Sequence, residues 1–155
     1  MKRGDKQIAA LPMRWGDGGT VEVLMITSRD TGRWIVPKGW TMPDHKPWDA
    51  AAIEALEEAG AEGHIGREAF GTYRYDKVLA DGSKRRVTVQ VFPMVVERLL
   101  KRWKERDERT RRWFPAREAA RLVDEPDLAE LLKRLKTKPK KLPVVGKLLK
   151  RAAAA

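Results

Sequence analysis

Three glutamates in one short stretch of the chain have the side-chain type and the spacing that metal chemistry requires. Glu54, Glu57 and Glu58 stand at positions i, i+3 and i+4, so on a helix their carboxylates project from one face within about one turn. Carboxylates at this spacing repel one another, and folding alone does not favour the arrangement. A hard cation such as Mg²⁺ or Mn²⁺ does favour it, because it is bound through oxygen and shares its coordination shell with water and substrate phosphates. The cluster therefore predicts a metal site.

Residues 47–59 are expected to form the helix that carries these acids. Most of them are strong helix formers, chiefly alanine and glutamate. Pro47 suits the first helical turn, where its missing N–H costs nothing, and Gly60 is suited to end the helix. Small apolar side chains such as Ala55 and Ala59 lie on the face away from the acids, so the helix can pack closely against a sheet.

A solvated acidic helix face is the alternative to a metal site, and the residues before the helix favour the metal site. Residues 34–39, Trp-Ile-Val-Pro-Lys-Gly, form a short apolar strand that runs into a turn. Gly39 lets the backbone approach an ion or a phosphate closely. The backbone carbonyl of Lys38 or Gly39 is therefore expected to be a further metal ligand.

The stretch 39–61 resembles the Nudix box, whose pattern is G-x5-E-x7-R-E-U-x-E-E-x-G-U, where U is aliphatic. Two positions depart from the pattern: His45 stands where the first glutamate is expected, and Ile53 where the arginine is expected. In the family that arginine orients a box carboxylate, so here the orientation of Glu57 or Glu58 is left to other groups. The matching residues are Gly39, Glu54, Glu57, Glu58, Gly60 and Ala61.

The resemblance extends to both sides of the box. Residues 28–37, and residues 111–114 followed by an Ala/Glu-rich helix, look like the diphosphoinositol polyphosphate phosphohydrolase branch of the Nudix family and its bacterial relatives. The matching pieces span about residues 7–135. The resemblance implies an α/β/α sandwich with a mixed central sheet, and a Nudix-type hydrolase that acts on phosphoric anhydride bonds.

The order of predicted elements agrees with this α/β (α+β) fold class. Alternating and apolar runs predict strands at residues 6–14, 20–27, 33–36, 64–78, 86–96 and 111–114. Helices are expected at 115–123 and 127–135 in addition to 47–59. Pro93, within one of the strands, suggests an edge position or a bulge. Strands with interspersed helices indicate a mixed sheet between helical layers.

Composition predicts one domain at residues 1–136 and a basic tail at 137–155. For the tail we expect a frayed, solubilising segment, and a short cationic amphipathic helix over 144–149 is the alternative. The chain has no cysteine, no apolar run long enough to cross a bilayer and no signal-peptide core at its N-terminus, so a cytoplasmic protein is expected. The net charge of +11 favours polyanionic partners. A membrane partner is not expected, RNA is a possible partner, and the oligomeric state stays open.

These observations predict a metal-dependent pyrophosphohydrolase that uses one to three Mg²⁺ or Mn²⁺ ions. Glu58 is expected to be the main ligand with Glu54 beside it, and Glu57 to be a ligand or the catalytic base. Glu97 and Glu105 are candidates for a further acid from outside the box. Cations at strand ends and around the box are expected to bind the substrate: Arg29, Arg33, Lys38, Arg74, Lys77, Arg86 and Arg111.

The expected substrate is a polyphosphorylated small molecule, either a nucleoside or dinucleoside polyphosphate or an inositol pyrophosphate. A different class of function remains open, in which a Nudix-like fold has lost efficient catalysis and serves as an RNA-binding or regulatory module. The basic charge and the two departures from the box motivate that alternative. Decapping of RNA 5′ ends would use the same chemistry as the enzyme.

Overall fold

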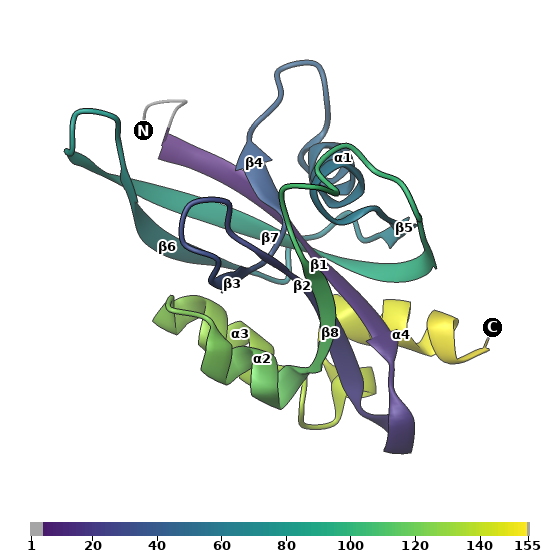
Figure 1. Cartoon of the computed structure of the whole chain (residues 1–155). Helices are drawn as coiled ribbons and strands as arrows, with labels where there is room; N and C mark the ends of the chain where they lie inside the picture. Colours follow the sequence, from purple (N-terminus) through teal and green to yellow (C-terminus); the bar gives the residue numbers. More distant parts are fainter. Residues whose placement is uncertain (1–4, 155) are drawn as a thin grey trace.

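A mixed sheet lies between two helical layers in the computed structural model, which describes residues 5–154. Helix α1 (Pro47–Ala59) covers one face of the sheet, while α2 (Ala116–Leu122), α3 (Pro126–Arg134) and α4 (Val145–Ala154) cover the other (Figure 1). The predicted α/β/α sandwich is therefore confirmed. Residues 1–4 of the predicted domain and residue 155 of the predicted tail lie outside the described part of the chain.

The strand order is β3-β2-β1-β7-β5, with β4 paired to β1, β6 to β7 and β8 to β2. Strands β1 and β7 run parallel, and the other pairs are antiparallel. The strand expected at 64–78 is two strands, and a short strand that was not expected leads out of the Pro/Gly turn. Within residues 5–154, the eight strands are β1 (Lys6–Trp15), β2 (Val21–Thr27), β3 (Trp34–Ile35), β4 (Lys38–Trp40), β5 (Ala61–Ile65), β6 (Gly71–Val78), β7 (Lys84–Leu99) and β8 (Arg111–Pro115).

Strand β1 is buried on both faces because helices cover both sides of the sheet. Ile8 and Ala10 belong to the apolar cluster under α1, whereas Leu11 and Met13 belong to the cluster shared with α2, α3 and α4. This explains why the strand is a nearly continuous apolar run rather than an alternating one. The alanine-rich face of α1 packs closely on the first cluster, as its small side chains predict.

Pro93 does not mark an edge strand, and this expectation is wrong. Its strand β7 lies inside the sheet, parallel to β1 on one side, with Leu11 opposite Pro93. On the other side β7 pairs with β6 up to Val91 and with β5 from Met94 onward. Pro93 therefore falls where one partner strand gives way to the next, and its missing N–H removes no bond from either ladder.

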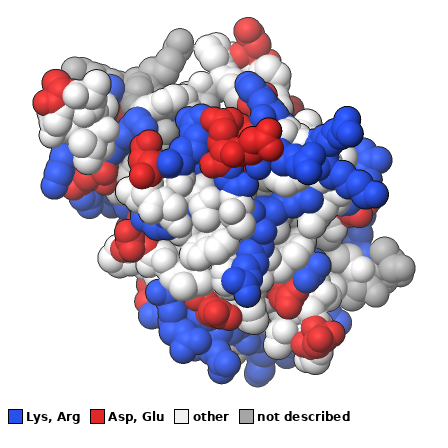
Figure 2. All heavy atoms as spheres, in the orientation of Figure 1, with Lys and Arg blue, Asp and Glu red and all other residues white. Residues whose placement is uncertain are grey.

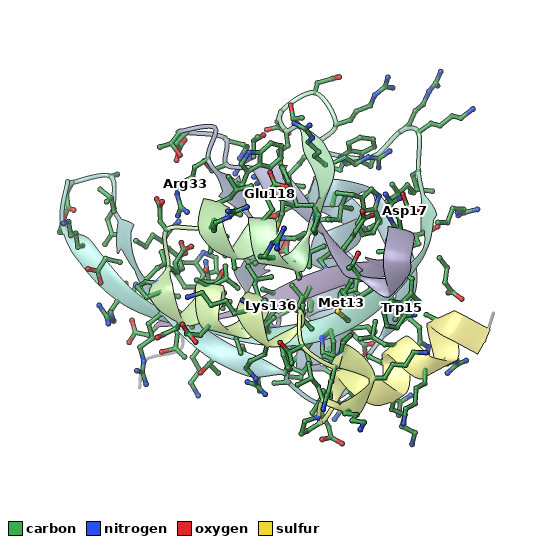
Figure 3. All side chains as sticks on the ribbon, turned by 90° about the horizontal axis from the view of Figure 1, so that it is seen from below. Met13, Trp15, Asp17, Arg33, Glu118 and Lys136 are labelled. Atoms are coloured by element: carbon green, nitrogen blue, oxygen red, sulfur yellow. The ribbon has the colours of Figure 1, made fainter. Side chains whose placement is uncertain are left out.

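The C-terminal segment is packed against the domain rather than frayed. Val145 and Leu149 of α4 are fully buried, and the indole Nε1 of Trp15 donates to the Leu149 carbonyl at 3.0 Å. Figure 3 shows Trp15 beside this helix. The amphipathic helix is thus formed, and its apolar face binds to the sheet's own core. Within residues 5–154, no helix is long and apolar enough to span a bilayer.

Candidate active site

Helix α1 runs over the residues predicted for it. It begins with Pro47 in its first turn and ends at Gly60, which adopts the left-handed conformation with φ of 62°. This conformation favours glycine and stops the helix. Of the three acids, Glu54 and Glu58 are buried on the inner side of the helix, and Glu57 is partly exposed with its carboxylate 3.6 Å from Lys104 Nζ.

Glu54 lies against the backbone of the turn that precedes the helix. A Cβ atom on Gly39 would collide with the Glu54 carboxylate, so only glycine leaves room for it there. The side chain is almost entirely buried, with 8% exposure. The structure therefore gives Gly39 a specific reason to be glycine: it brings β4 and a box carboxylate together.

Glu58 is held from two sides. Its Oε1 accepts a hydrogen bond from the Lys38 backbone N–H at 3.2 Å, and its Oε2 lies 3.7 Å from Arg109 Nη2. Arg109 belongs to residues 100–110, which link β7 to β8. Neither neighbour is part of α1, so the orientation of this carboxylate depends on the packing of distant segments.

Burial changes the acidity of both inner glutamates. Desolvation, together with the charges of Glu58 and Glu57, raises the pKa of Glu54 to about 7. Desolvation also raises the pKa of Glu58 to about 7, although Arg109 and the Lys38 N–H oppose the change. Neighbouring carboxylates that resist ionisation are suited to a cation, which would relieve both the desolvation and the repulsion.

The oxygen donors fit Mg²⁺ or Mn²⁺ in type. The Glu54 carboxylate rests against Gly39 and that of Glu58 against the Lys38 N–H, so both reach the same turn. Within residues 5–154, no three acidic or imidazole side chains already form a metal-ligand cluster. Glu54 and Glu58 are therefore the two carboxylates that lie against this turn, and Glu57 lies at the rim of the acidic site.

Lys38 connects this acidic site to a polar network formed by Tyr75 of β6 and Gln7 of β1. Its Nζ donates to the Tyr75 hydroxyl at 3.1 Å, and that hydroxyl donates to Gln7 Oε1 at 2.7 Å. Gln7 is buried, with 4% exposure, and desolvation lowers the pKa of Lys38. Lys38 thus contacts Glu58 through its backbone N–H, and its side chain joins the hydrogen-bonded pair of Tyr75 and Gln7.

A cleft of about 470 Å³ continues from Tyr75 and contains three of the predicted substrate-binding arginines. Arg33 is paired with Glu125 at 2.9 Å and Asp124 at 3.5 Å. Arg33 lies at the far end of the helical layer from Trp15 and α4 (Figure 3). The charged residues that line the cleft are Arg33, Arg74, Arg86, Asp76, Asp124, Glu125 and Asp127.

Three other residues that were predicted to bind the substrate make their contacts outside this cleft. Arg29 is exposed and pairs with Glu108 at 3.2 Å, near the rim of the acidic site. The Lys77 Nζ lies 5.8 Å from the ring of Trp40. The guanidinium of Arg111 donates hydrogen bonds to the carbonyls of Ala59 and Leu100. It therefore binds at the end of α1 rather than in the cleft.

The candidate residues other than the three box glutamates lie in different parts of the structure. Glu105 is close to the site, since its charge raises the pKa of both Glu54 and Glu58. Glu97 is exposed on β7, and His45 is exposed in the loop before α1. The structure therefore supports Glu105 as a neighbour of the acidic site.

Sequence reasoning missed Arg109, Tyr75 and Gln7. Residues 101–109 are predicted to be a charged loop, and Trp103 is the single apolar residue in that run. Tyr73 and Tyr75 alternate in one strand, which placed both on one face but did not reveal the hydrogen bond to Gln7.

On the face displayed in Figure 2, a compact acidic group is bordered on both sides by Lys and Arg side chains.

Residues 6–135 match a family model described as the NUDIX domain. The chain belongs to the Nudix family. A rat relative, diphosphoinositol polyphosphate phosphohydrolase 2, is 34% identical over 120 residues, which cover 74% of this chain and 63% of the relative. The chain therefore spans a little under two thirds of that relative's length.

Solved structures of Nudix proteins share the fold. A Caenorhabditis elegans Ap4A hydrolase in a binary complex superimposes with a TM-score of 0.63 at 22% identity, covering 83% of this chain and 93% of that one. The Escherichia coli dihydroneopterin triphosphate pyrophosphohydrolase gives a TM-score of 0.65 at 18% identity, covering 85% and 94%. At these identities the likeness establishes the architecture.

Proposed function

We propose that this Nudix domain is a metal-dependent pyrophosphohydrolase that cleaves a diphosphate bond in a polyphosphorylated substrate. The observation that carries the proposal is the pair of buried carboxylates, Glu54 and Glu58, packed against the backbone of Lys38 and Gly39. Two buried, mutually repelling carboxylates destabilise a fold unless a cation binds to them. Membership of the Nudix family supports the same activity.

Glu54 and Glu58, with a backbone carbonyl of Lys38 or Gly39, would hold the ion, and Glu57 would complete the set or act as the base. When bound, Mg²⁺ or Mn²⁺ would supply charge neutralisation on the diphosphate and activation of a water molecule. The chain itself excludes water from Glu54 and Glu58 and fixes Glu58 between Lys38 and Arg109. This division leaves Glu57 able to move, because within residues 5–154 its ion-pair partner is the exposed Lys104.

The charges of the cleft favour a nucleoside or dinucleoside polyphosphate over an inositol pyrophosphate. Arg33 is already neutralised by Glu125 and Asp124, and Arg86 lies 3.4 Å from Asp76. A ring phosphorylated on every side would place phosphates against these carboxylates. A nucleoside would instead offer hydroxyl and amino groups, which donate hydrogen bonds to carboxylates.

The test is a substrate panel with the purified chain and a titration of Mg²⁺ and Mn²⁺. The panel contains nucleoside triphosphates, diadenosine tetraphosphate, a diphosphoinositol polyphosphate and 5′-triphosphorylated RNA. We expect turnover of a nucleotide substrate that chelator abolishes, and a loss of roughly a hundredfold or more in Glu58→Gln. Glu97→Gln is the matched control, because Glu97 is exposed on β7.

Activity in Glu58→Gln equal to that of the unchanged chain would exclude the proposed site. Preferential cleavage of the diphosphoinositol substrate would refute the assignment to nucleotides while leaving the hydrolase proposal intact. The alternative of an RNA-binding module has its own signature, which is salt-sensitive RNA binding without metal and no turnover across the panel.

A further inference from the structure

The segment between β7 and β8 is fastened to the C-terminal end of α1. Helix ends leave backbone carbonyls without partners inside the helix, and such groups need donors from elsewhere. Four consecutive carbonyls at this end find donors in residues 100–111. They are Glu57 O with Glu105 N at 3.0 Å, Glu58 O with Trp103 Nε1 at 3.2 Å, Ala59 O with Arg111 Nη1 at 2.9 Å and Gly60 O with Leu100 N at 2.8 Å.

This attachment carries the guanidinium of Arg109 to the buried side of the acidic site. The side chain is 7% exposed, and it makes three contacts with groups from different parts of the chain. Its Nη1 donates to the Thr27 carbonyl at 3.0 Å, and its Nε donates to Glu105 Oε1 at 2.8 Å. Its Nη2 is then directed at Glu58 Oε2, 3.7 Å away.

We propose that Arg109 is a positioning residue for Glu58, which it holds in the orientation needed to bind the ion. Position 53 of α1, where the family pattern has an arginine, is isoleucine in this chain, so that position supplies no cationic partner to the box carboxylates. Arg109 supplies one from outside the helix. The inference deepens the proposed function and rests on it for its link to catalysis, while its effect on metal binding is testable without any turnover.

The planar guanidinium suits this role better than an ammonium group. Its donors lie in a fixed fork, so contacts with Thr27 and Glu105 determine where the remaining Nη2 points. Lysine would keep the charge but could not make all three contacts in that geometry. Because Arg109 is buried and acts through Glu58, it is expected to affect kcat and the metal dependence with little effect on KM.

The experiment is a double-mutant cycle on metal-free, full-length protein with Mn²⁺ as the probe, measured by titration calorimetry. The proteins are the unchanged chain, Arg109→Met, Glu58→Gln and the double variant. Arg109→Met is expected to weaken Mn²⁺ binding about tenfold, because the loss of a group that orients a metal ligand has effects of that size. In the Glu58→Gln background the same change should weaken Mn²⁺ binding little further, because the carboxylate that Arg109 positions is already absent.

Arg98→Met is the matched control, because Arg98 is an exposed arginine paired with Glu62 at the surface. It should bind Mn²⁺ as the unchanged chain does. If Arg109→Met does not fold, as judged by circular dichroism, the cycle is run with Arg109→Lys, which keeps the positive charge and should show a smaller loss in the same direction.

Two results would overturn the inference. One is Mn²⁺ affinity in the Arg109 variants equal to that of the unchanged chain. The other is a loss that persists at full size in the Glu58→Gln background, which would show that Arg109 acts through some other group. Absence of turnover in the unchanged chain, with the expected Mn²⁺ cycle intact, would contradict the proposed function and leave the role of Arg109 standing.

Discussion

At the scale of single residues, Glu54 and Glu58 combine burial with negative charge. Each is less than one-tenth exposed, and each has a pKa raised to about 7 from the ordinary value of 4.5, chiefly by desolvation. The folded protein therefore binds protons at these sites more tightly than the unfolded chain does. The linked contribution to stability is fully present below pH 4.5 and is lost as the pH rises through about 7.

Metal-free protein is accordingly expected to lose stability as the pH rises from about 5 to 8, by up to about 5 kcal/mol from this pair. The measurement is urea unfolding in the presence of chelator at both ends of that range. The Glu54→Gln/Glu58→Gln double variant, which has no charge to gain there, should show a flatter dependence. Added Mg²⁺ should oppose the loss at high pH, because the ion binds the ionised carboxylates. A metal-free protein that becomes more stable over this range through these two groups would contradict the assignment.

Gly39 provides a second prediction at this scale. Gly39→Ala would place a Cβ where the Glu54 carboxylate lies, and one of the two must move. We expect the fold to survive, because the carboxylate is at the end of a flexible side chain, and metal-dependent turnover to fall at least tenfold. Circular dichroism and the substrate panel measure the two effects separately. Full activity in Gly39→Ala would show that Glu54 is not needed in this position.

The sequence was sufficient to predict the acids and the glycine, but not the arginine that supports them. Glu54, Glu58 and Gly39 lie within twenty residues of one another, and their contact follows from a turn and a helix. Arg109 reaches Glu58 only through the arrangement of residues 100–111 around the helix end. No local spacing encodes such a contact, because it depends on tertiary packing.

At the scale of elements, α1 was predictable at both ends because proline and glycine mark them chemically. The attachment of residues 100–111 to the same helix was not, because its donors are backbone N–H groups, an indole and a guanidinium scattered through a charged run. Trp103 is central to that attachment. Its Nε1 donates to Glu58 O, and the Arg111 guanidinium stacks 3.8 Å from its ring centroid.

Trp103→Phe should therefore destabilise the protein more than Trp113→Phe does. Both changes remove the same volume, but within residues 5–154 the buried Nε1 of Trp113 has no hydrogen-bond partner to lose. The expected difference is about 1 kcal/mol, the usual net worth of a hydrogen bond. Chemical denaturation of the two variants measures it. Equal losses in both would mean that the indole contact does not hold the helix end.

At the scale of the whole molecule, the basic C-terminal segment is part of the core. Composition alone suggested a frayed tail, because lysines and short apolar runs do not say what the apolar face will cover. In the structure Val145 and Leu149 complete the cluster beneath α2 and α3. The domain that folds therefore extends beyond the residues matched by the family model.

Leu149→Ala should cost about 2–5 kcal/mol of folding free energy, as expected for a buried leucine. Leu56→Ala is the control, since Leu56 on α1 is 36% exposed, and it should change stability by no more than about 0.5 kcal/mol. Thermal or urea unfolding measures both. A loss in Leu149→Ala no larger than that of the control would show that the C-terminal helix detaches in solution.

The parallel pairing of β1 with β7 affects how the chain can fold during synthesis. Lys6 lies opposite Thr88, so β1 has no long partner until roughly eighty further residues have been made. Until then the edge of β1 that pairs with β7 is open, while β2 and β4 can pair along its other edge. Over this interval the nascent chain exposes an apolar strand with one open edge, which is a hazard for aggregation with other chains.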